Sequence, residues 1–540
     1  MALNPPPRFD QFALESGTTV EDKYFFIDGC EGIETRRPFW KLGTTKSPDI
    51  RNFRINQQKQ LVASKGFTHI GTTLNSQSSV AVFGYAVKGN TDLYIVTTAG
   101  IQVGRLTISG VTDIIALTGP TLQLSLGERV TFAAWGEQYL LIATRVHKLI
   151  EVDLVAGTYA FNDEAPEGAG HIEIMNGRVV LSDFVLTPRR VQWSAKFDKD
   201  DWDGLGAGFE DLPSVNGLDP VWGVYPYSET QGFVVRQDSI NIVQTSDSFD
   251  APFRFQQQYN DVKCYAPRSI CKIPGGVILH TYANVMVLTP GERRFVGDPV
   301  LARDFNSATT QTLTIFATYD PIEREYWIYG LDEITSGKAL HCYNLFHNVW
   351  TSITPVTANT AMPYFTYVGG LGSTAYEDLS GAYSVQVETL DTLGAGSGGH
   401  ELIYTAQGTL MYTLSAGSGG ANGWRIETGE IELDSPANKL SVVDVEVGFI
   451  CVTAATFDIG VQKIQEGTIT TLENKAVTIN TTQPQKLNFP CSITGHTVRF
   501  AAFANGGGGS GGLGSGTGLS PVLLDYVRVR CLKSARSVTA

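Results

Sequence analysis

The chain has 540 residues, of which 42% are hydrophobic and 17% are charged, and its formal net charge is −14. This length suggests two or three domains, and the hydrophobic content indicates a globular rather than a disordered protein. An acidic chain does not supply the clustered Lys and Arg with which a protein grips nucleic acid, so that class is disfavoured. The 57 glycines favour many short strands joined by tight turns.

Residues 1–65 show little periodic pattern and carry three consecutive prolines and the basic stretch Arg36-Arg37-Pro38. A segment that cannot bury its own surface usually docks onto a neighbouring body or subunit. We therefore expect an extended N-terminal arm, with one short helix near 48–62, and the alternative is a disordered tail. The start of the chain has no basic segment followed by an apolar run, so no signal peptide is expected.

Residues 66–423 repeat a unit made of an apolar strand, a turn and a second alternating strand. The copies follow one another at intervals of 38 to 54 residues, and their starts lie at 92, 139, 177, 231, 276, 326 and 373. A four-stranded propeller blade occupies about 40 to 50 residues, so the spacing fits a blade and is too long for a hairpin. The prediction is an all-β protein with a β-propeller of six to eight blades, most simply seven. A stack of irregular β-sandwiches is the alternative.

Residues 424–540 change character and alternate apolar and polar residues, as half-buried antiparallel strands do. This pattern predicts a C-terminal antiparallel β-sandwich. Its glycine-rich stretch at 506–518 is expected to be a flexible loop between two strands. No apolar run approaches the roughly 18 residues that cross a bilayer, so no membrane insertion is predicted.

Motifs that could carry chemistry are weak. Ser510 sits in a G-x-S-x-G pattern, but it lies inside glycine repeats rather than between a strand and a helix. The acidic run 198–204 places Trp202 where a calcium loop needs a ligand, so a solvated acidic turn between blades is the preferred interpretation. His341, Cys342 and His347 could bind a metal, but neighbouring strand residues point to opposite faces, which favours packing.

The seven cysteines are scattered, and no C-x-x-C pair occurs among them. Reduced thiols packed as small apolar side chains are therefore expected, and the protein is expected to be made in a reducing cytoplasm. No phosphate-binding loop occurs either. No catalytic residue, metal ligand or cofactor is predicted, and the chain is interpreted as a non-enzyme. A propeller glycosidase, with facing carboxylates around its axis, is the open alternative.

Five segments in chain order together resemble the propeller-containing tail nozzle and hub proteins of short-tailed, podovirus-like bacteriophages. The first is Tyr24-Phe-Phe-Ile-Asp-Gly followed by Thr35-Arg-Arg-Pro. The others are Asn176-Gly-Arg-Val-Val-Leu-Ser-Asp with Trp193-Ser and Asp201-Trp, Ala266-Pro-Arg-Ser-Ile with Gly275-Gly-Val, Tyr319-Asp-Pro with Glu325-Tyr-Trp, and Glu427-Thr-Gly-Glu-Ile. Nozzle and hub remain two possibilities within this class.

The resemblance implies a structural virion protein, made in the host cytoplasm and located in the tail. Similar proteins form a homo-oligomeric ring, commonly a hexamer, below the adaptor that follows the portal. The ring prolongs the DNA channel, retains the genome and allows its ejection, and it meets tail fibre or spike proteins. DNA would pass without sequence-specific binding, since an acidic ring does not hold phosphate by ion pairs. Arg36, Arg37 and Pro38 are the candidate contact with a neighbouring subunit or the adaptor. The alternative function is a glycan-binding or glycan-hydrolysing propeller, as in receptor-binding proteins and depolymerases.

Overall fold

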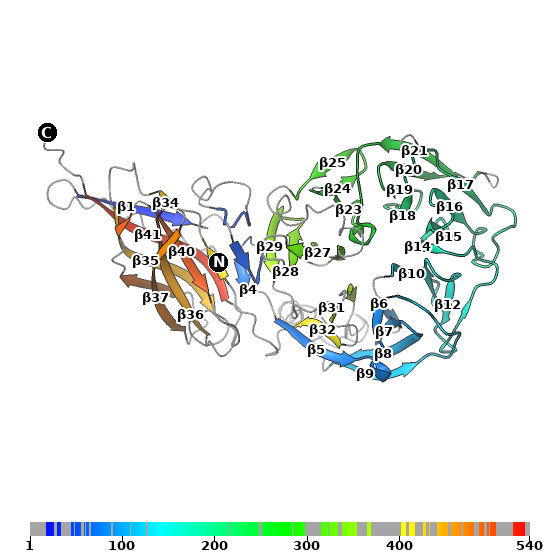
Figure 1. Ribbon diagram of the computed structural model, residues 1–540, viewed down its shortest axis with the longest axis horizontal. Coiled ribbons are helices and arrows are strands. Elements are labelled where there is room, and N and C mark those ends of the chain that lie inside the picture. Colours follow the sequence, from blue (N-terminus) through cyan, green and yellow to red (C-terminus); the bar gives the residue numbers. More distant parts are fainter. Residues whose placement is uncertain are drawn as a thin grey trace, which may run out of the picture. The chain divides into compact units, whose positions relative to one another are not determined.

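A computed structural model describes the residues discussed from here on (Figure 1). They are 18–25, 30–33, 45–47, 49–55, 59, 61–63, 66–87, 90–107, 110–125, 128–214, 217–246, 248, 251–282, 284–297, 315–321, 323–332, 337–353, 364–368, 401–406, 410–415, 425–427, 431–432, 440–451, 455–465, 468–479, 485–490, 494–495, 497–503 and 522–534. Within these ranges nearly all regular structure is β-strand, and the helical elements are two single 3₁₀ turns, η2 (Leu74–Ser76) and η3 (Pro267–Ser269). The all-β prediction is confirmed.

The chain divides into two compact units. One contains residues 67–341 and 355–419, and the other contains residues 1–66, 342–354 and 420–540. The first unit is a β-propeller, as the strand spacing predicted, and its blades follow one another around a ring in Figure 1.

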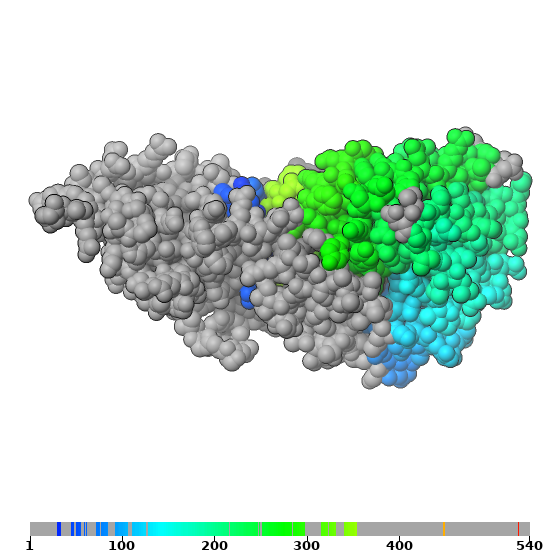
Figure 2. Space-filling view, turned by 45° about the horizontal axis from the view of Figure 1, so that its top comes forward, coloured from blue at the N-terminus to red at the C-terminus, as the bar shows by residue number. Residues whose placement is uncertain are grey.

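Each blade is a four-stranded antiparallel sheet. The strands of the blades, in chain order, are β6 (Ser79–Val87), β7 (Asn90–Thr97), β8 (Ile101–Thr107) and β9 (Gly110–Ala116); β10 (Val130–Trp135), β11 (Tyr139–Thr144), β12 (Ile150–Asp153) and β13 (Thr158–Phe161); β14 (Ala169–Met175), β15 (Arg178–Phe184), β16 (Arg190–Trp193) and β17 (Gly208–Asp211); β18 (Val221–Pro226), β19 (Gln231–Arg236), β20 (Ile240–Thr245) and β21 (Phe253–Tyr259); and β22 (Cys271–Ile273), β23 (Gly276–Thr281), β24 (Asn284–Thr289) and β25 (Glu292–Phe295). In the space-filling view, the described residues of these blades form one continuous coloured body (Figure 2).

Two further sets of four strands follow, although β29 and the end of β28 belong to the other unit. The strands β26 (Phe316–Asp320), β27 (Glu325–Asp332), β28 (Gly337–Asn344) and β29 (Val349–Ile353) follow one another in a longer sheet. The last blade combines β30 (Tyr364–Val368), β31 (Glu401–Ala406) and β32 (Leu410–Ser415) with β5 (Gly66–Thr72), which comes from far earlier in the chain. The described strands thus make seven four-stranded sets, six of them separate sheets.

The first strands of successive blades contact one another along the inside of the ring. Contacts join β30 to β6, β6 to β10, β10 to β14 and β14 to β18, while β18 contacts β23 and β26 contacts both β22 and β30. Because β30 meets β6, the ring closes on itself. Closure leaves only short strand edges exposed.

The apolar core lies between blades, and the second strands carry most of it. All residues of β15 and β23 are buried, whereas the outermost strands β17 and β25 are mostly exposed. Successive residues of β15 face opposite neighbours: Val179 and Leu181 pack with Leu141 of the preceding blade, and Val180 packs with Val224 of the next. Burial on both faces explains why each of these strands contains an unbroken apolar stretch, at 179–181 and at 277–279.

Turn chemistry sets the hairpins of the blades. Asn176 and Gly177 join β14 to β15 with positive φ angles of 51° and 68°, which is the two-residue turn that Asn-Gly favours between antiparallel strands. Between β24 and β25, Gly291 has φ 85° directly after Pro290, as a type II turn requires. Short, well-defined turns keep the four strands of a blade in register.

Five of the seven predicted repeat starts fall on the second strand of a blade, namely on β7, β11, β19, β23 and β27, and the start at 177 directly precedes β15. The seventh start, at 373, lies outside the described residues. The strands β31 and β32 that follow it lie within the predicted propeller range 66–423 and belong to the closing blade.

The second unit contains two sheets. The first has the order β3-β4-β41-β35-β38, with β1 on β41 and β39 on β35, and the second contains β2, β33, β40, β36 and β37 in that order, with β34 on β40. Their bounds are β1 (Thr18–Phe25), β2 (Asp49–Arg51), β3 (Phe53–Ile55), β4 (Leu61–Ala63), β33 (Arg425–Glu427), β34 (Ile431–Glu432), β35 (Leu440–Cys451), β36 (Ala455–Gln465), β37 (Thr468–Ile479), β38 (Gln485–Pro490), β39 (Thr494–Gly495), β40 (Thr497–Phe503) and β41 (Val522–Ser534). The loop at 506–518 lies outside the described residues.

The N-terminal strands are part of this second unit. Strand β1 pairs with β41 over eight residues, and β4 also pairs with β41. The predicted helix near 48–62 is wrong, because this segment forms β2, β3 and β4. Phe53 and Ile55 are buried on either side of the half-buried Arg54, which is the alternation of a strand rather than of a helix.

The cysteines whose side chains are described are free thiols. Cys30, Cys264 and Cys342 are buried and Cys271 is partly buried, in line with the expected packing role. In the described ranges, no helix has the length and apolar character that crossing a membrane would take.

Candidate functional site at the propeller axis

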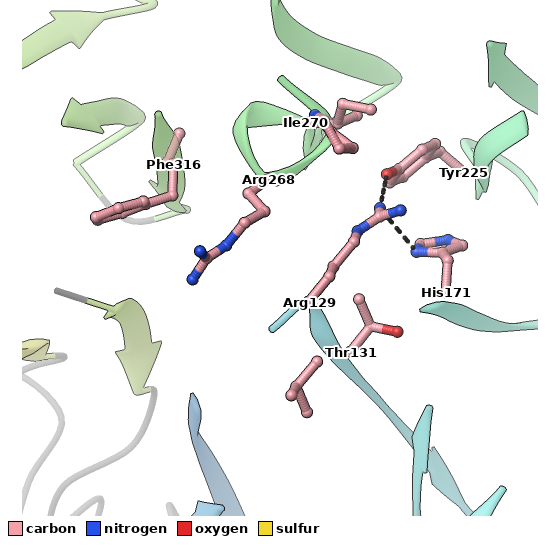
Figure 3. Close-up of a pocket in the computed structure, with 10 residues that line it drawn as sticks. Arg129, Thr131, His171, Tyr225, Arg268, Ile270 and Phe316 are labelled. Carbon is pink, nitrogen blue, oxygen red and sulfur yellow. Dashed lines mark hydrogen bonds between the residues drawn. The ribbon is translucent and has the colours of Figure 1, made fainter. Parts of the chain in front are cut away.

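A cavity of about 130 Å³ opens where the inner strands of four blades converge (Figure 3). Its lining comes from β10, β14, β18 and β26, with the 3₁₀ turn η3 contributing from the blade that begins at β22. Because first strands lie on the inside of the ring, the cavity lies at the propeller axis. The polar lining groups are Arg129, Thr131, His171, Tyr225 and Arg268.

Arg129 is the central side chain of this cluster, although only 7% of the residue is exposed. It directly precedes β10. Its Nη1 donates to Asp183 Oδ2 at 2.7 Å and to the carbonyl oxygen of Trp222. Its Nη2 donates to the Tyr225 hydroxyl at 3.1 Å and lies 3.5 Å from Nδ1 of His171 (Figure 3). One guanidinium therefore connects three consecutive blades.

Asp183, near the end of β15, is the anion of the cluster. Besides Arg129, it accepts hydrogen bonds from Nε and Nη2 of Arg145, which also lies over the ring of Trp222 at 5.7 Å. The residue has a left-handed backbone, with φ 63°. Gly170 on the neighbouring strand leaves room for it, since a Cβ there would lie 2.5 Å from Asp183 Oδ2. The chain is shaped locally to hold this carboxylate between two arginines.

His171 on β14 is neutral at ordinary pH. Burial, reinforced by the charge of Arg129, lowers its pKa to about 3. Its Nε2 lies 3.0 Å from the carbonyl oxygen of Val224, so the proton is on Nε2 and Nδ1 faces Arg129 as an acceptor. The ring also lies against Tyr225, with 4.8 Å between the centroids. The histidine thus orients the arginine rather than adding positive charge.

The opposite side of the cavity is more open. Arg268 in η3 is partly exposed, and its guanidinium lies 5.1 Å from the centre of the Phe316 ring. Glu128 feels the charges of Arg145 and Arg268, although burial raises its pKa overall. The Arg268 guanidinium therefore lies on the Phe316 side of the cavity, whereas Ile270 lies on the side of Tyr225 (Figure 3).

The residues singled out in the sequence lie elsewhere. Arg36, Arg37 and Pro38 are outside the described residues, as is Ser510. In the acidic run, Asp198, Asp200 and Asp203 are exposed, as expected of a solvated turn. Lys199 within that run is buried, however, and its Nζ reaches Glu151 Oε2 of the preceding blade at 2.8 Å.

His341 and Cys342 are buried and His347 is partly buried. Across the part of the chain that the structure describes, no group of three His, Cys, Asp or Glu side chains is arranged to hold a metal ion.

Sequence reasoning missed the Arg129 cluster. Arg129 precedes Asp183 by 54 positions and Tyr225 by 96. In the sequence, a single arginine before an apolar strand is indistinguishable from an ordinary turn residue. The available signal was a charged residue, Asp183, two positions after the apolar stretch 179–181.

No family model matches the chain, and no curated protein matches it. Among solved structures, the chain is similar to virginiamycin B lyase from Staphylococcus aureus, with 9% identity, a TM-score of 0.39, and coverage of 65% of this chain and 99% of that one. It is also similar to the WD40 domain of Toxoplasma gondii coronin, with 10% identity, a TM-score of 0.38, and coverage of 68% and 87%. The function therefore has to be argued from the chain itself.

Proposed function

We propose that this chain is a non-enzymatic structural protein of a virion, the tail nozzle or hub subunit of a short-tailed bacteriophage. Copies of it would form a ring, most simply a hexamer, that extends the DNA channel below the portal and adaptor. The ring would retain the genome until ejection. The protein would be made in the host cytoplasm and end in the tail, in contact with the adaptor and with fibre or spike proteins.

The observation that carries the proposal is that the polar groups at the propeller axis bond to one another across neighbouring blades. Both terminal nitrogens of Arg129 are engaged with neighbouring blades, and Asp183 is held by two arginines. A catalytic group usually has a reactive atom open to its substrate, whereas these atoms join blades to one another. Such an arrangement supports a rigid scaffold that must keep its shape under load.

Charge is consistent with a conduit. The net charge of −14 does not favour holding DNA by ion pairs, because each phosphate contact would need a Lys or Arg. Arg129 in the axial cluster does not offer a contact for phosphate either, because it is buried and its charge is paired with Asp183. A cavity of about 130 Å³ is far too small to hold a DNA duplex, so the DNA channel would run between copies of the chain.

The size and the carboxylates of the axial cavity give little support to the alternative of a glycan-binding or glycan-hydrolysing protein. Ligand pockets generally measure about 300 to 1,000 Å³. Glycosidases also need two carboxyl groups about 5 to 9.5 Å apart with the substrate between them. Among the described residues, the carboxylates near the cavity include Asp183, which two arginines hold, and Glu128, which lies beside Arg129 in the chain. No specific feature of the site favours hydrolysis.

Negative-stain electron microscopy of the full chain, alone and with its adaptor, tests the proposal. The expected result is a closed ring around a central hole, with the adaptor stacked coaxially. Isolated discs in both samples would contradict it. A parallel assay for release of reducing sugar from host polysaccharide separates the alternative, and turnover there would contradict the non-enzymatic assignment.

A further inference from the structure

Lys199, Asn162 and Glu151 meet between two neighbouring blades. Lys199 lies in the loop between β16 and β17, whereas Asn162 directly follows β13 and Glu151 is in β12 of the preceding blade. Lys199 is only 8% exposed and Asn162 only 6%. An amine, a carboxamide and a carboxyl group are thus held together largely away from water.

The carboxylate of Glu151 bridges the other two side chains. Its Oε2 accepts a hydrogen bond from Nζ of Lys199 at 2.8 Å, and its Oε1 accepts one from Nδ2 of Asn162 at 2.5 Å. Both nitrogens also donate to Oδ1 of Asp200, each at 2.7 Å. The amine and the carboxamide nitrogen are therefore neighbours, and one carboxyl group contacts both.

The carbonyl oxygen of the Asn162 side chain is held by backbone donors. The N–H groups of Glu164 and Ala165 both donate to Oδ1 at 3.0 Å. These contacts fix which end of the carboxamide faces Glu151. Two N–H donors on one carbonyl oxygen are also the arrangement that stabilises a developing oxyanion. Cγ of Asn162 is thereby made more open to attack by a nucleophile.

The surroundings determine where protons can go. Burial raises the pKa of Glu151, so this carboxylate takes up a proton more readily than an exposed glutamate does. Burial opposes the charge of Lys199, but hydrogen bonds with Asp200 and Glu151 outweigh it and raise the pKa of the amine. The ammonium is therefore the resting form, and an attack requires that a carboxylate take its proton. Glu151 is in contact to do so, and the ring of Tyr139, with its centre 4.6 Å from Nζ, covers the amine.

We propose that Lys199 and Asn162 form an intramolecular isopeptide bond, with Glu151 acting as general base and then as general acid. Glu151 takes a proton from the Lys199 ammonium, and the free Nζ attacks Cγ of Asn162. The Nζ–Cγ bond forms and the Cγ–Nδ2 bond breaks. Two protons in total pass from Nζ through Glu151 to the departing nitrogen, which leaves as ammonium. No atom is oxidised or reduced, and no co-reactant is needed.

The bond would tie two blades together covalently. It closes a loop that contains β14, β15 and β16, and a cross-link of this kind stabilises a fold mainly by restricting the unfolded chain. The side chain of Asp200 is 56% exposed, so the ammonium has a route to solvent. The bond is independent of ring formation, because a single propeller would carry it whether or not the chain is a tail protein.

The test is mass spectrometry of the full, unfolded chain. The isopeptide bond lowers the intact mass by that of one ammonia molecule relative to the sequence. Trypsin does not cleave after an acylated lysine, so it should release residues 149–178 joined to residues 197–236 through Asn162 and Lys199. An intact mass equal to that of the sequence would overturn the proposal. So would a missing ammonia without this joined peptide, because the loss would then lie elsewhere in the chain.

Two variants assign the role of Glu151. Glu151→Gln keeps both reacting groups and removes the proton carrier, so the full sequence mass should return and the joined peptide should be lost. Lys148→Arg changes a lysine whose Nζ lies 3.3 Å from Oδ1 of Asp163, next to Asn162 in the chain, and the bond should form as before. Circular dichroism confirms that both variants are folded. A joined peptide at the yield of the unaltered chain in Glu151→Gln, or its loss in both variants, would overturn the assignment.

Discussion

Arg129 and Asp183 form a buried ion pair between neighbouring blades, with 2.7 Å between Nη1 and Oδ2. The two side chains are 8% and 2% exposed. Arg129 directly precedes β10 and Asp183 lies near the end of β15, so the pair joins two separate sheets. The two residues are 54 positions apart in the chain, so the pair holds one blade to the next rather than the strands of one blade to each other.

Replacing Asp183 with Asn tests how much this ion pair contributes to the stability of the folded protein. Asn tolerates the φ of 63° at this position, so the change removes charge without straining the backbone. Because Arg129 would be left as a buried, uncompensated cation, we expect the free energy of unfolding to fall by about 3 kcal/mol. Urea unfolding followed by tryptophan fluorescence measures this.

The matched control is Asp211→Asn, which breaks an exposed pair with Arg190 on the edge of the same blade. Exposed pairs of this kind are worth about 1 kcal/mol or less. Equal losses in the two variants would show that burial of the Asp183 pair is irrelevant to stability.

As the pH falls, the propeller should begin to lose stability at a higher pH than protonation of its carboxylates alone would produce. Burial lowers the pKa of His171 from 6.5 to about 3 and that of His280 to about 4. Between these values and 6.5 the unfolded chain binds protons that the folded chain does not, so stability rises with pH there. Their full contribution is present above pH 6.5 and is lost progressively as the pH falls toward the folded values.

The diagnostic window is pH 6.5 to 5, where few carboxylates titrate. Each histidine contributes a slope of up to about 1.4 kcal/mol per pH unit. We expect His171→Gln to reduce the slope by up to that amount. Unfolding free energies measured by urea titration at several pH values supply the test, and an unaltered slope in the variant would contradict the assignment of a neutral, buried His171.

The blades were predictable because their second strands are buried on both faces. In β15 and β23 this produces apolar runs that can be recognised without knowing what they pack against. The closing blade was not predictable in the same way. Its strand β5 lies near the start of the chain and pairs with β32. A local sequence pattern cannot indicate a pairing partner that is so far away in the sequence.

The axial site was also hidden from sequence reasoning. Arg129, His171 and Tyr225 come from three different blades, and each lies next to an apolar strand with no motif of its own. Only the ring brings these residues together. The helix expected near 48–62 failed for a related reason, because pairing between β4 and β41 overrides the local preferences of the segment.

Assembly should depend on the basic stretch of the N-terminal segment if the ring proposal is correct. The double variant Arg36→Ala/Arg37→Ala removes two donors that could meet an acidic neighbour. We expect fewer rings in negative stain and a shift toward monomer in light scattering, without a change in unfolding. A charge-matched control, Arg105→Ala/Arg254→Ala on the propeller, should assemble normally. Normal rings from the first variant would contradict the contact role of Arg36 and Arg37.

Strand β5 should stabilise the propeller more than an ordinary edge strand does, because it closes the ring. In any register, one of two successive residues directs its N–H at the neighbouring strand, so Thr68→Pro/His69→Pro must remove a ladder hydrogen bond with β32. We expect a loss of about 2 kcal/mol in unfolding free energy and faster proteolysis throughout the propeller.

The same change in β17, Phe209→Pro/Glu210→Pro, provides the comparison, since β17 is also an outermost strand but continues directly from its own blade. A detached β17 remains tethered beside β16 and frays locally. Detaching β5 frees strands that lie more than 300 positions apart, and the loop must be closed again at an entropic cost. Limited proteolysis distinguishes the two: cleavage confined to one blade is expected for the β17 variant, and cleavage across several blades for the β5 variant. Confined cleavage in both would mean that the ring holds without its N-terminal strand.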